Sequence, residues 1–148
     1  MEEVKMAENE IQVVAFKLGS QEYALDILSV QEIIKLQNIA RVPRTSYYVQ
    51  GVINLRGNVI PVFNLHKRFN IESAGKNEDK RIIVFQFDDI KAGVIVDGVS
   101  EVLRIKSDDI EDAVKVYSSV DHDFIQGVGK VDGRLLILLN LESLLGVN

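Results

Sequence analysis

The chain has 148 residues, no cysteine and a formal net charge of −5. Its length suits one domain or two small halves, and the missing cysteines exclude disulfides and cysteine-based zinc sites. The acidic balance argues against nucleic acid as a partner, and the basic residues are scattered between acidic ones: Arg41, Arg44, Lys67, Arg68, Lys80 and Arg81. No run approaches the roughly 20 apolar residues of a membrane span. The start is acidic where a signal peptide is basic. We therefore expect a soluble, cytoplasmic protein without membrane insertion.

Short β-strands dominate the first third of the chain. Residues 1–10 lack periodicity and are expected to form a flexible tail. Two strands follow, at 11–18 and 21–27, with a hairpin turn at Gly19 and Ser20. Segment 28–36 fits either a helical turn or a strand. Pro43 begins a loop that contains Tyr47 and Tyr48, a pair that we expect to lie in the core.

The middle and end of the chain continue this pattern. Residues 51–65, GVINLRGNVIPVFNL, predict a hairpin that ends in a short helix after Asn64. A polar loop at 71–80 precedes strands at 81–87, 91–99 and 100–105. Residues 107–123 are a polar connector, and a second hairpin follows from Gly127. The strand RIIVFQF is apolar at successive positions, which is typical of a strand buried on both faces.

The sequence contains an internal repeat. Residues 51–65 align with 127–141 at an offset of 76, and 16–34 align with 85–103 at an offset of 69. Polar and glycine positions fall in register along with the apolar ones: Gly51 with Gly127, Gly57 with Gly133, Asn64 with Asn140, and Glu32 with Glu101. The fold class is therefore mainly β. We expect two five-stranded barrels, related by an approximate two-fold axis around a shared core, with a few short helices.

The repeat also provides an internal control for the hairpin turns. The second copy has Asp132-Gly133, a favoured two-residue turn, whereas the first has Arg56-Gly57. Arginine gives such a turn no help, so Arg56 is a candidate for function. The alternative is a solvated arginine at an exposed hairpin tip.

The sequence offers no convincing catalytic site. His66 lies in the expected helical turn after Asn64. His122 lies between Asp121 and Asp123, a group that supplies too few metal ligands and has no recognised metal-binding spacing. Phosphate-binding loops and nucleophile motifs are missing. Glu32 and Glu101 resemble an acid–base pair, but their equivalent repeat positions favour symmetric structural roles. We therefore expect a non-enzymatic protein without cofactor or metal.

Four motifs together resemble the CheW family of bacterial chemotaxis coupling proteins, over residues 11–145: YALDILSVQEII, GVINLRGNVIPVFNL, GVIVDGVSEVL and GRLLILLNLESLL. The same module ends the chemotaxis kinase CheA and begins the CheV adaptors. No kinase or receiver sequence flanks it here, so we expect the stand-alone coupling protein. The resemblance implies one domain at 11–148, made of two SH3-like barrel units with interdigitated segments, approximately 11–80 and 81–148.

The resemblance also implies partners. Family members are non-enzymatic adaptors that couple the cytoplasmic tip of methyl-accepting chemoreceptors to the regulatory domain of the histidine kinase CheA. They support receptor-array assembly and kinase control, and ring contacts form with CheA or with other CheW copies. The expected location is the cytoplasm, with recruitment to membrane-associated chemoreceptor arrays.

The resemblance places the receptor tip in a groove between the two units. The matching receptor-binding positions are Val30, Glu32, Ile33, Gly51, Arg56, Val99 and Val102. Aliphatic side chains would receive an amphipathic helix, and charged groups would fix its register. The kinase-binding residues are unknown. Two alternatives remain open, namely an adaptor for another kind of array and a small hydrolase that uses Glu32 and Glu101.

Overall fold

The computed structural model describes residues 9–112 and 124–144. The strands are β1 (Glu10–Leu18), β2 (Gln21–Asp26), β3 (Val30–Lys35), β4 (Val49–Leu55), β5 (Asn58–Asn64), β6 (Arg81–Phe87), β7 (Ile90–Val96), β8 (Gly98–Lys106), β9 (Ile110–Asp112), β10 (Ile125–Val131) and β11 (Arg134–Leu139). The α-helices are α1 (Leu65–Phe69) and α3 (Leu141–Leu144), and short 3-10 turns are η1 (Ile27–Ser29), η2 (Asn77–Asp79) and η3 (Ser107–Asp109). Among these residues no helix is long and apolar enough to cross a membrane.

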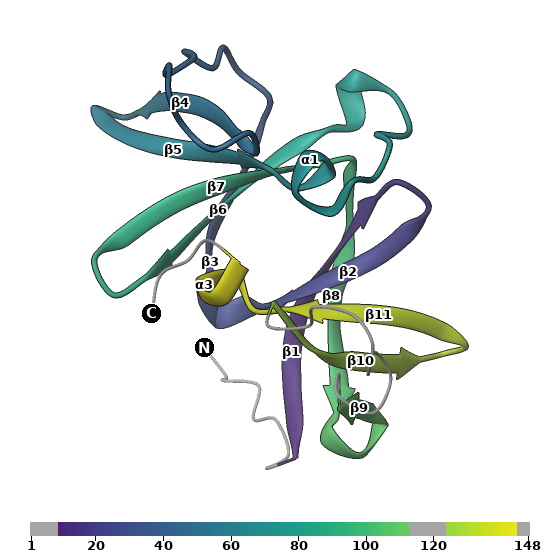
Figure 1. Cartoon of the computed structure of the whole chain (residues 1–148). Helices are drawn as coiled ribbons and strands as arrows, with labels where there is room; N and C mark the ends of the chain where they lie inside the picture. The colour runs from purple at the N-terminus through teal and green to yellow at the C-terminus, as the bar shows by residue number, and fades with distance from the viewer. Residues whose placement is uncertain (1–8, 113–123, 145–148) are drawn as a thin grey trace. The chain divides into compact units, whose positions relative to one another are not determined.

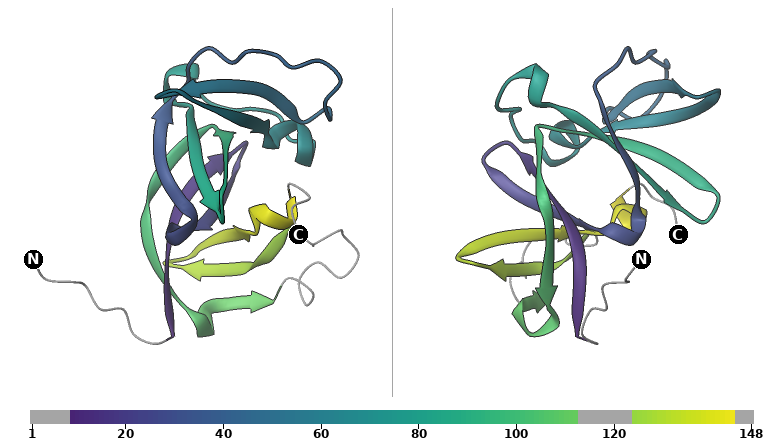
Figure 2. Two further views of the ribbon diagram at one scale, coloured as in Figure 1. Left: turned by 90° about the vertical axis from the view of Figure 1, so that its left-hand side faces the viewer. Right: turned by 180° about the vertical axis from the view of Figure 1, so that it is seen from behind.

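The chain divides into two compact units whose segments alternate along the sequence (Figures 1 and 2). The first unit holds Phe16–Gln21 and Leu28–Ser100, and the second holds the residues up to Ala15, Glu22–Ile27 and the residues from Glu101 onward. These limits differ from 11–80 and 81–148 for two reasons. Strands β6 and β7 pair with β3 and β5 and so belong to the first unit's sheet, whereas β2 pairs in parallel with β11 and so joins the second unit's sheet. Most of β1 goes with it.

The two sheets follow one plan. One has the order β3-β6-β7-β5-β4 and the other β8-β1-β2-β11-β10-β9. The hairpin registers match at the predicted offset of 76: Gly51 pairs with Val62 in β4–β5, and Gly127 pairs with Leu138 in β10–β11. The parallel ladders match at both offsets, since Val62 faces Gly93 and Leu138 faces Ala24. The predicted repeat and the mainly β fold are therefore confirmed, but the second sheet has six strands where five were predicted, because β9 pairs with β10 at its edge.

Each unit has its own buried cluster. The first unit's cluster contains Ile53, Leu55, Ile60, Val62, Ile82 and Val84. The second unit's cluster contains Val13, Ala15, Ala24, Ile105, Leu136 and Leu138. Strand β6 is buried at every position from Ile82 to Phe85, as its unbroken apolar run predicts, because side chains on both of its faces are shielded from water.

Local signals in the sequence explain several boundaries. Gly19 and Ser20 form the predicted turn between β1 and β2. Asn64 caps α1, its side-chain oxygen accepting a hydrogen bond of 3.0 Å from the Lys67 amide. The ambiguous segment 28–36 resolves into the end of η1 followed by β3. Its alternation of half-buried and exposed residues in β3 is that of a strand with one solvated face.

Candidate functional site

Arg56 and Glu32 meet on the surface of the first unit. Arg56 occupies the β4–β5 turn and Glu32 lies on β3; Nη2 of Arg56 donates a hydrogen bond to Oε2 of Glu32. This contact raises the pKa of the Arg56 guanidinium above its ordinary value, mainly through the hydrogen bond and then through the opposite charge. The arginine side chain is 68% exposed. Exposed pairs of this kind contribute little to folding, and the exposed guanidinium is accessible to a partner.

The turn itself has the geometry that the sequence predicts. Arg56 has φ 52° and Gly57 has φ 88°, and the equivalent Asp132 and Gly133 have φ 49° and 79°. Asn54 supports the first turn by accepting a hydrogen bond of 2.8 Å from the Gly57 amide. Left-handed φ is ordinary for asparagine, aspartate and glycine but costs energy for arginine. Arg56 therefore sits where the backbone favours a different residue.

The second unit has its own arginine–glutamate contact, which the sequence comparison of Arg56 with Asp132 missed. Arg134 lies two positions beyond Asp132 and donates hydrogen bonds of 2.9 and 2.7 Å to the two carboxylate oxygens of Glu22. Its Nη1 lies 3.5 Å from Oε1 of Glu101, the repeat equivalent of Glu32. An arginine–glutamate pair at the hairpin is thus common to both units. The signal available in the sequence was the arginine at position 134, directly after Gly133.

What distinguishes Arg56 is its exposure and its single carboxylate partner. Arg134 is 32% exposed and contacts two glutamates, whereas Arg56 is 68% exposed and contacts one. Glu32 and Glu101 fall in different units and each contacts an arginine of its own unit. Each glutamate thus has an arginine neighbour in its own unit, although Glu22 and not Glu101 is the nearer partner of Arg134.

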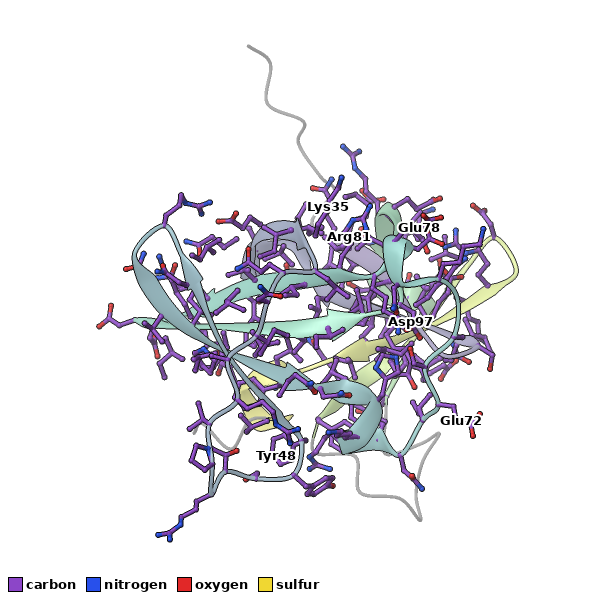
Figure 3. All side chains as sticks on the ribbon, turned by 90° about the horizontal axis from the view of Figure 1, so that it is seen from above. Lys35, Tyr48, Glu72, Glu78, Arg81 and Asp97 are labelled. Atoms are coloured by element: carbon purple, nitrogen blue, oxygen red, sulfur yellow. The ribbon has the colours of Figure 1, made fainter. Side chains whose placement is uncertain are left out.

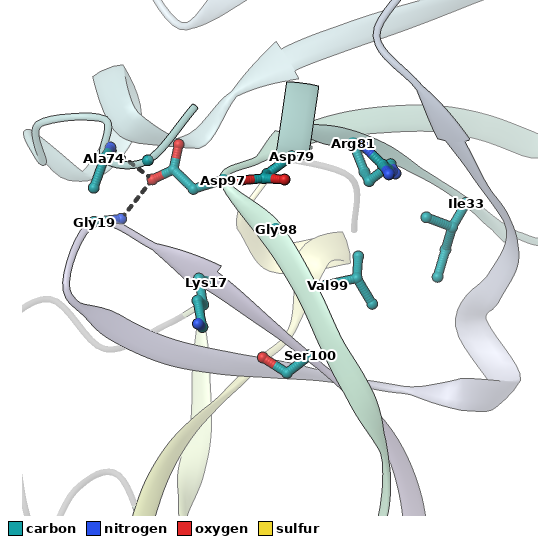
Figure 4. Close-up of a pocket in the computed structure, with 11 residues that line it drawn as sticks. Lys17, Gly19, Ile33, Ala74, Asp79, Arg81, Asp97, Gly98, Val99 and Ser100 are labelled. Carbon is teal, nitrogen blue, oxygen red and sulfur yellow. Dashed lines mark hydrogen bonds between the residues drawn. The ribbon is translucent and has the colours of Figure 1, made fainter. Parts of the chain in front are cut away.

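Two predicted aliphatic residues line one cavity of the first unit. Ile33 of β3 and Val99 of β8 border a cavity of about 600 Å³, together with the charged residues Lys17, Asp79, Arg81 and Asp97. Figure 4 shows Ile33 and Val99 on one side of this space and Asp97 toward the other. Ile33 is 39% exposed. The first unit therefore offers an open hollow with aliphatic and charged walls.

The other predicted positions have different surroundings. Val30 is half-buried at the start of β3. Gly51 is buried, and a Cβ there would lie 2.1 Å from the backbone oxygen of Ala40. Val102 is 49% exposed and belongs to the second unit. The structure thus brings Glu32 to Arg56 and Ile33 to Val99, while Gly51 is explained by the close approach of a neighbouring backbone.

Asp97, which the sequence reasoning did not single out, joins three segments of the first unit. Its residue is 6% exposed at the end of β7. The carboxylate accepts hydrogen bonds from His66 Nε2 at 2.9 Å, from Ser73 Oγ at 2.7 Å, and from the amides of Gly19 and Ala74 at 2.7 and 3.1 Å. Figure 4 shows the two amide contacts. An acidic residue directly after a buried strand was the available signal.

Burial acts to raise the pKa of the Asp97 carboxyl, but the hydrogen bonds from His66, Gly19, Ser73 and Ala74 outweigh it and leave the pKa below its ordinary value of 3.8. The carboxylate thus contributes stability above pH 3.8 that is lost as the pH falls through the lower folded-state pKa.

We expect the difference in unfolding free energy between wild type and Asp97→Asn to shrink as the pH falls below 3.8. Urea unfolding at several acidic pH values measures this, and a difference independent of pH would contradict it.

Within the described ranges, 9–112 and 124–144, no group of three or more histidine, cysteine, aspartate or glutamate side chains could hold a metal ion. His66, expected in a helical turn, is buried in α1 and its ring contacts Asp97. The group Asp121-His122-Asp123 lies outside the described residues.

Duplicated β-units, an exposed ion pair and an open hollow with aliphatic walls define a β-barrel binding module.

Comparison with known proteins shows which family this module belongs to. The family model for the CheW-like domain matches residues 12–147 of this chain. The chain is 38% identical over 143 residues to the chemotaxis protein CheW of Helicobacter pylori, across 95% of this chain and 86% of that protein. It is 34% identical to the chemotaxis protein CheW of Bacillus subtilis, across 97% and 90%. The scaffolding protein TtCheW from Thermoanaerobacter tengcongensis has a similar structure, with a TM-score of 0.84, 40% identity and coverage of 93% and 94%.

The chain belongs to the CheW family. It is a chemotaxis scaffold or adaptor protein with SH3-like β-barrel units, and its family is not one of enzymes. This membership removes the hydrolase alternative, in agreement with the separate arginine partners of Glu32 and Glu101.

Proposed function

We propose that this protein couples the cytoplasmic tip of methyl-accepting chemoreceptors to the regulatory domain of the histidine kinase CheA. Membership of the CheW family supports the adaptor role. The observation that carries the receptor assignment is the exposed Arg56–Glu32 pair in the unit that also holds the cavity lined by Ile33 and Val99. We also propose that it acts in the cytoplasm at membrane-associated receptor arrays.

The chemistry of these residues suits a helical partner. Ile33 and Val99 would receive the apolar face of an amphipathic receptor helix, as in other helix-in-groove complexes. Arg56 and Glu32 would contact polar groups beside that face and fix its register. Val30 and Val102 are proposed to add aliphatic contacts, and Gly51 is proposed to act by shaping β4 rather than by direct contact, since it is buried.

We expect Arg56→Asp to weaken binding of a receptor-tip fragment by about 1–3 kcal/mol, because an exposed arginine hot spot is lost and a repulsive charge is introduced. The free energy of unfolding should change little, since an exposed ion pair contributes little to folding. Isothermal titration calorimetry and urea unfolding measure the two effects. Lys130→Asp, at an exposed position of β10 in the second unit that also carries an ion pair, is the matched control.

Binding of the receptor fragment at wild-type strength by Arg56→Asp would remove Arg56 from the receptor site. The charge swap Arg56→Glu with Glu32→Arg separates two roles of the arginine. Recovery of binding by the swap would assign the pair to local structure, whereas a persistent loss supports direct contact between Arg56 and the receptor.

The coupling role itself is tested by two NMR titrations of the labelled protein. A receptor-tip fragment and the CheA regulatory domain should shift two separate sets of amide peaks, and both ligands should bind together. Overlapping sets with mutual displacement would contradict an adaptor. The same experiment would identify the kinase-binding residues and any contacts that lead to rings.

A further inference from the structure

A second feature of the first unit is the segment from β3 to the end of α1, which includes the β3–β4 loop and carries an unusual concentration of positive charge. Residues 33–71 contain six lysine or arginine residues and no aspartate or glutamate, whereas the rest of the chain has 11 basic and 22 acidic residues, a net charge of −11. Three of the basic residues that looked scattered in the sequence, Arg41, Arg44 and Lys67, border one cavity of about 400 Å³ here.

Arg44 has the same backbone anomaly as Arg56. Five non-glycine residues have positive φ among those described, and three are the asparagine or aspartate that this region favours: Asn70, Asp88 and Asp132. The other two are Arg44, at φ 60°, and Arg56. A strained residue that gives the turn no benefit is a reason to look for function. Within the described part of the chain, the guanidinium groups of Arg41 and Arg44 have no ion-pair partner.

The backbone of the β3–β4 loop is held by local contacts. Thr45 Oγ1 donates to the Val42 carbonyl at 3.2 Å, and the Val49 amide donates to Ser46 at 3.0 Å. Tyr47 packs edge-on against Tyr48, with 5.4 Å between ring centroids. Tyr48 in turn stacks on the ring of a β5 phenylalanine at 6.0 Å.

The expectation that both tyrosines lie in the core is wrong for Tyr47, whose side chain is 66% exposed. Val42, which borders the same cavity, is 40% exposed. These two side chains add apolar surface to the basic cavity. In Figure 3 the half-buried Tyr48 lies well apart from Asp97, so this loop is separate from the carboxylate-centred cluster.

We propose that the β3–β4 loop is a second binding site, which takes an acidic peptide segment of a protein partner through Arg41, Arg44, Lys67 and Tyr47. A short segment of aspartate and glutamate with one aromatic or aliphatic side chain matches both the charge and the exposed apolar surface. The net charge of −11 over the rest of the chain repels extended polyanions such as nucleic acids or anionic membranes. A compact acidic segment avoids that repulsion.

The test uses the intact protein and a fluorescent eight-residue peptide of glutamate and aspartate with one central tyrosine. Wild type should bind this peptide, and binding should weaken as salt increases. Arg44→Asn should weaken it about tenfold, because a charged hydrogen-bonding group is lost. The same variant should leave the melting temperature unchanged or raise it by about 2–4 °C, since asparagine tolerates left-handed φ. A purely structural role for Arg44 predicts a lower melting temperature instead.

Four controls accompany this test. Arg104→Gln, on the other unit, should bind the peptide like wild type, and a peptide of glutamine and asparagine should not bind. Arg44→Asn should bind the receptor-tip fragment with wild-type affinity, and Arg56→Asp should bind the acidic peptide with wild-type affinity. Loss of one binding activity can therefore be distinguished from loss of the other. The proposal would be overturned if wild type did not bind the peptide, or if Arg44→Asn bound it equally well. It would also be overturned if wild type bound only phosphatidylglycerol vesicles or inorganic phosphate.

Discussion

Replacement of Asp97 by alanine should lower the free energy of unfolding by about 3–5 kcal/mol, because several buried donors lose the carboxylate that accepts their hydrogen bonds. The carboxylate is almost inaccessible, and its loss leaves several donors without an acceptor: the amides of Gly19 and Ala74, the Ser73 hydroxyl and the His66 ring. Each buried donor left unpaired costs about 1–3 kcal/mol. Urea unfolding followed by circular dichroism measures the change.

The location of the effect is also predicted. Amide exchange at Gly19 and Ala74 should accelerate in Asp97→Ala before global unfolding, because Asp97 holds both segments to the end of β7. Asp89→Ala, in the exposed turn between β6 and β7, is the matched control and should change stability by less than about 0.5 kcal/mol. A change below about 1 kcal/mol for Asp97→Ala would show that water or neighbouring groups replace the carboxylate.

Replacement of Gly51 by alanine should cost about 2–6 kcal/mol. Part of this arises from φ 151°, a conformation that costs a side-chain-bearing residue about 1–3 kcal/mol. The rest arises from overpacking, typically about 1–3 kcal/mol, because the new Cβ would lie 2.1 Å from the backbone oxygen of Ala40. The isolated bridge between Ala40 and Val52 would have to open. Thermal and urea unfolding measure the loss.

The repeat supplies a graded control for Gly51. At Gly127 a Cβ would lie 2.8 Å from the Glu111 oxygen, without positive φ, so Gly127→Ala should cost less. Gly57 has φ 88° and no neighbour within 4 Å, so Gly57→Asn should cost only about 1 kcal/mol. Equal costs at Gly51 and Gly57 would contradict the close-approach explanation. Loss of receptor binding in Gly51→Ala is expected to follow the loss of β4 geometry.

The repeat was predictable from the sequence because it depends on local rules. Glycine at the hairpin bulge, asparagine at the helix cap and the positive-φ turns each require particular residues at particular spacings. When Gly51 recurs as Gly127 and Asn64 as Asn140, equivalent hairpins are expected, and the two registers agree. The mainly β fold and the exposed position of Arg56 follow from the same patterns.

Other features depended on the tertiary structure because they join residues far apart in the chain. Neither the pairing of Arg134 with Glu22 nor that of Asp97 with Gly19 has a local signature, since their partners are 112 and 78 residues away. The basic cavity exists because the fold places Lys67 of α1 beside the loop that carries Arg41 and Arg44. Local residue types determined the turns, caps and strands of this protein. Long-range packing decided which charges are paired, and therefore which surfaces are available to partners.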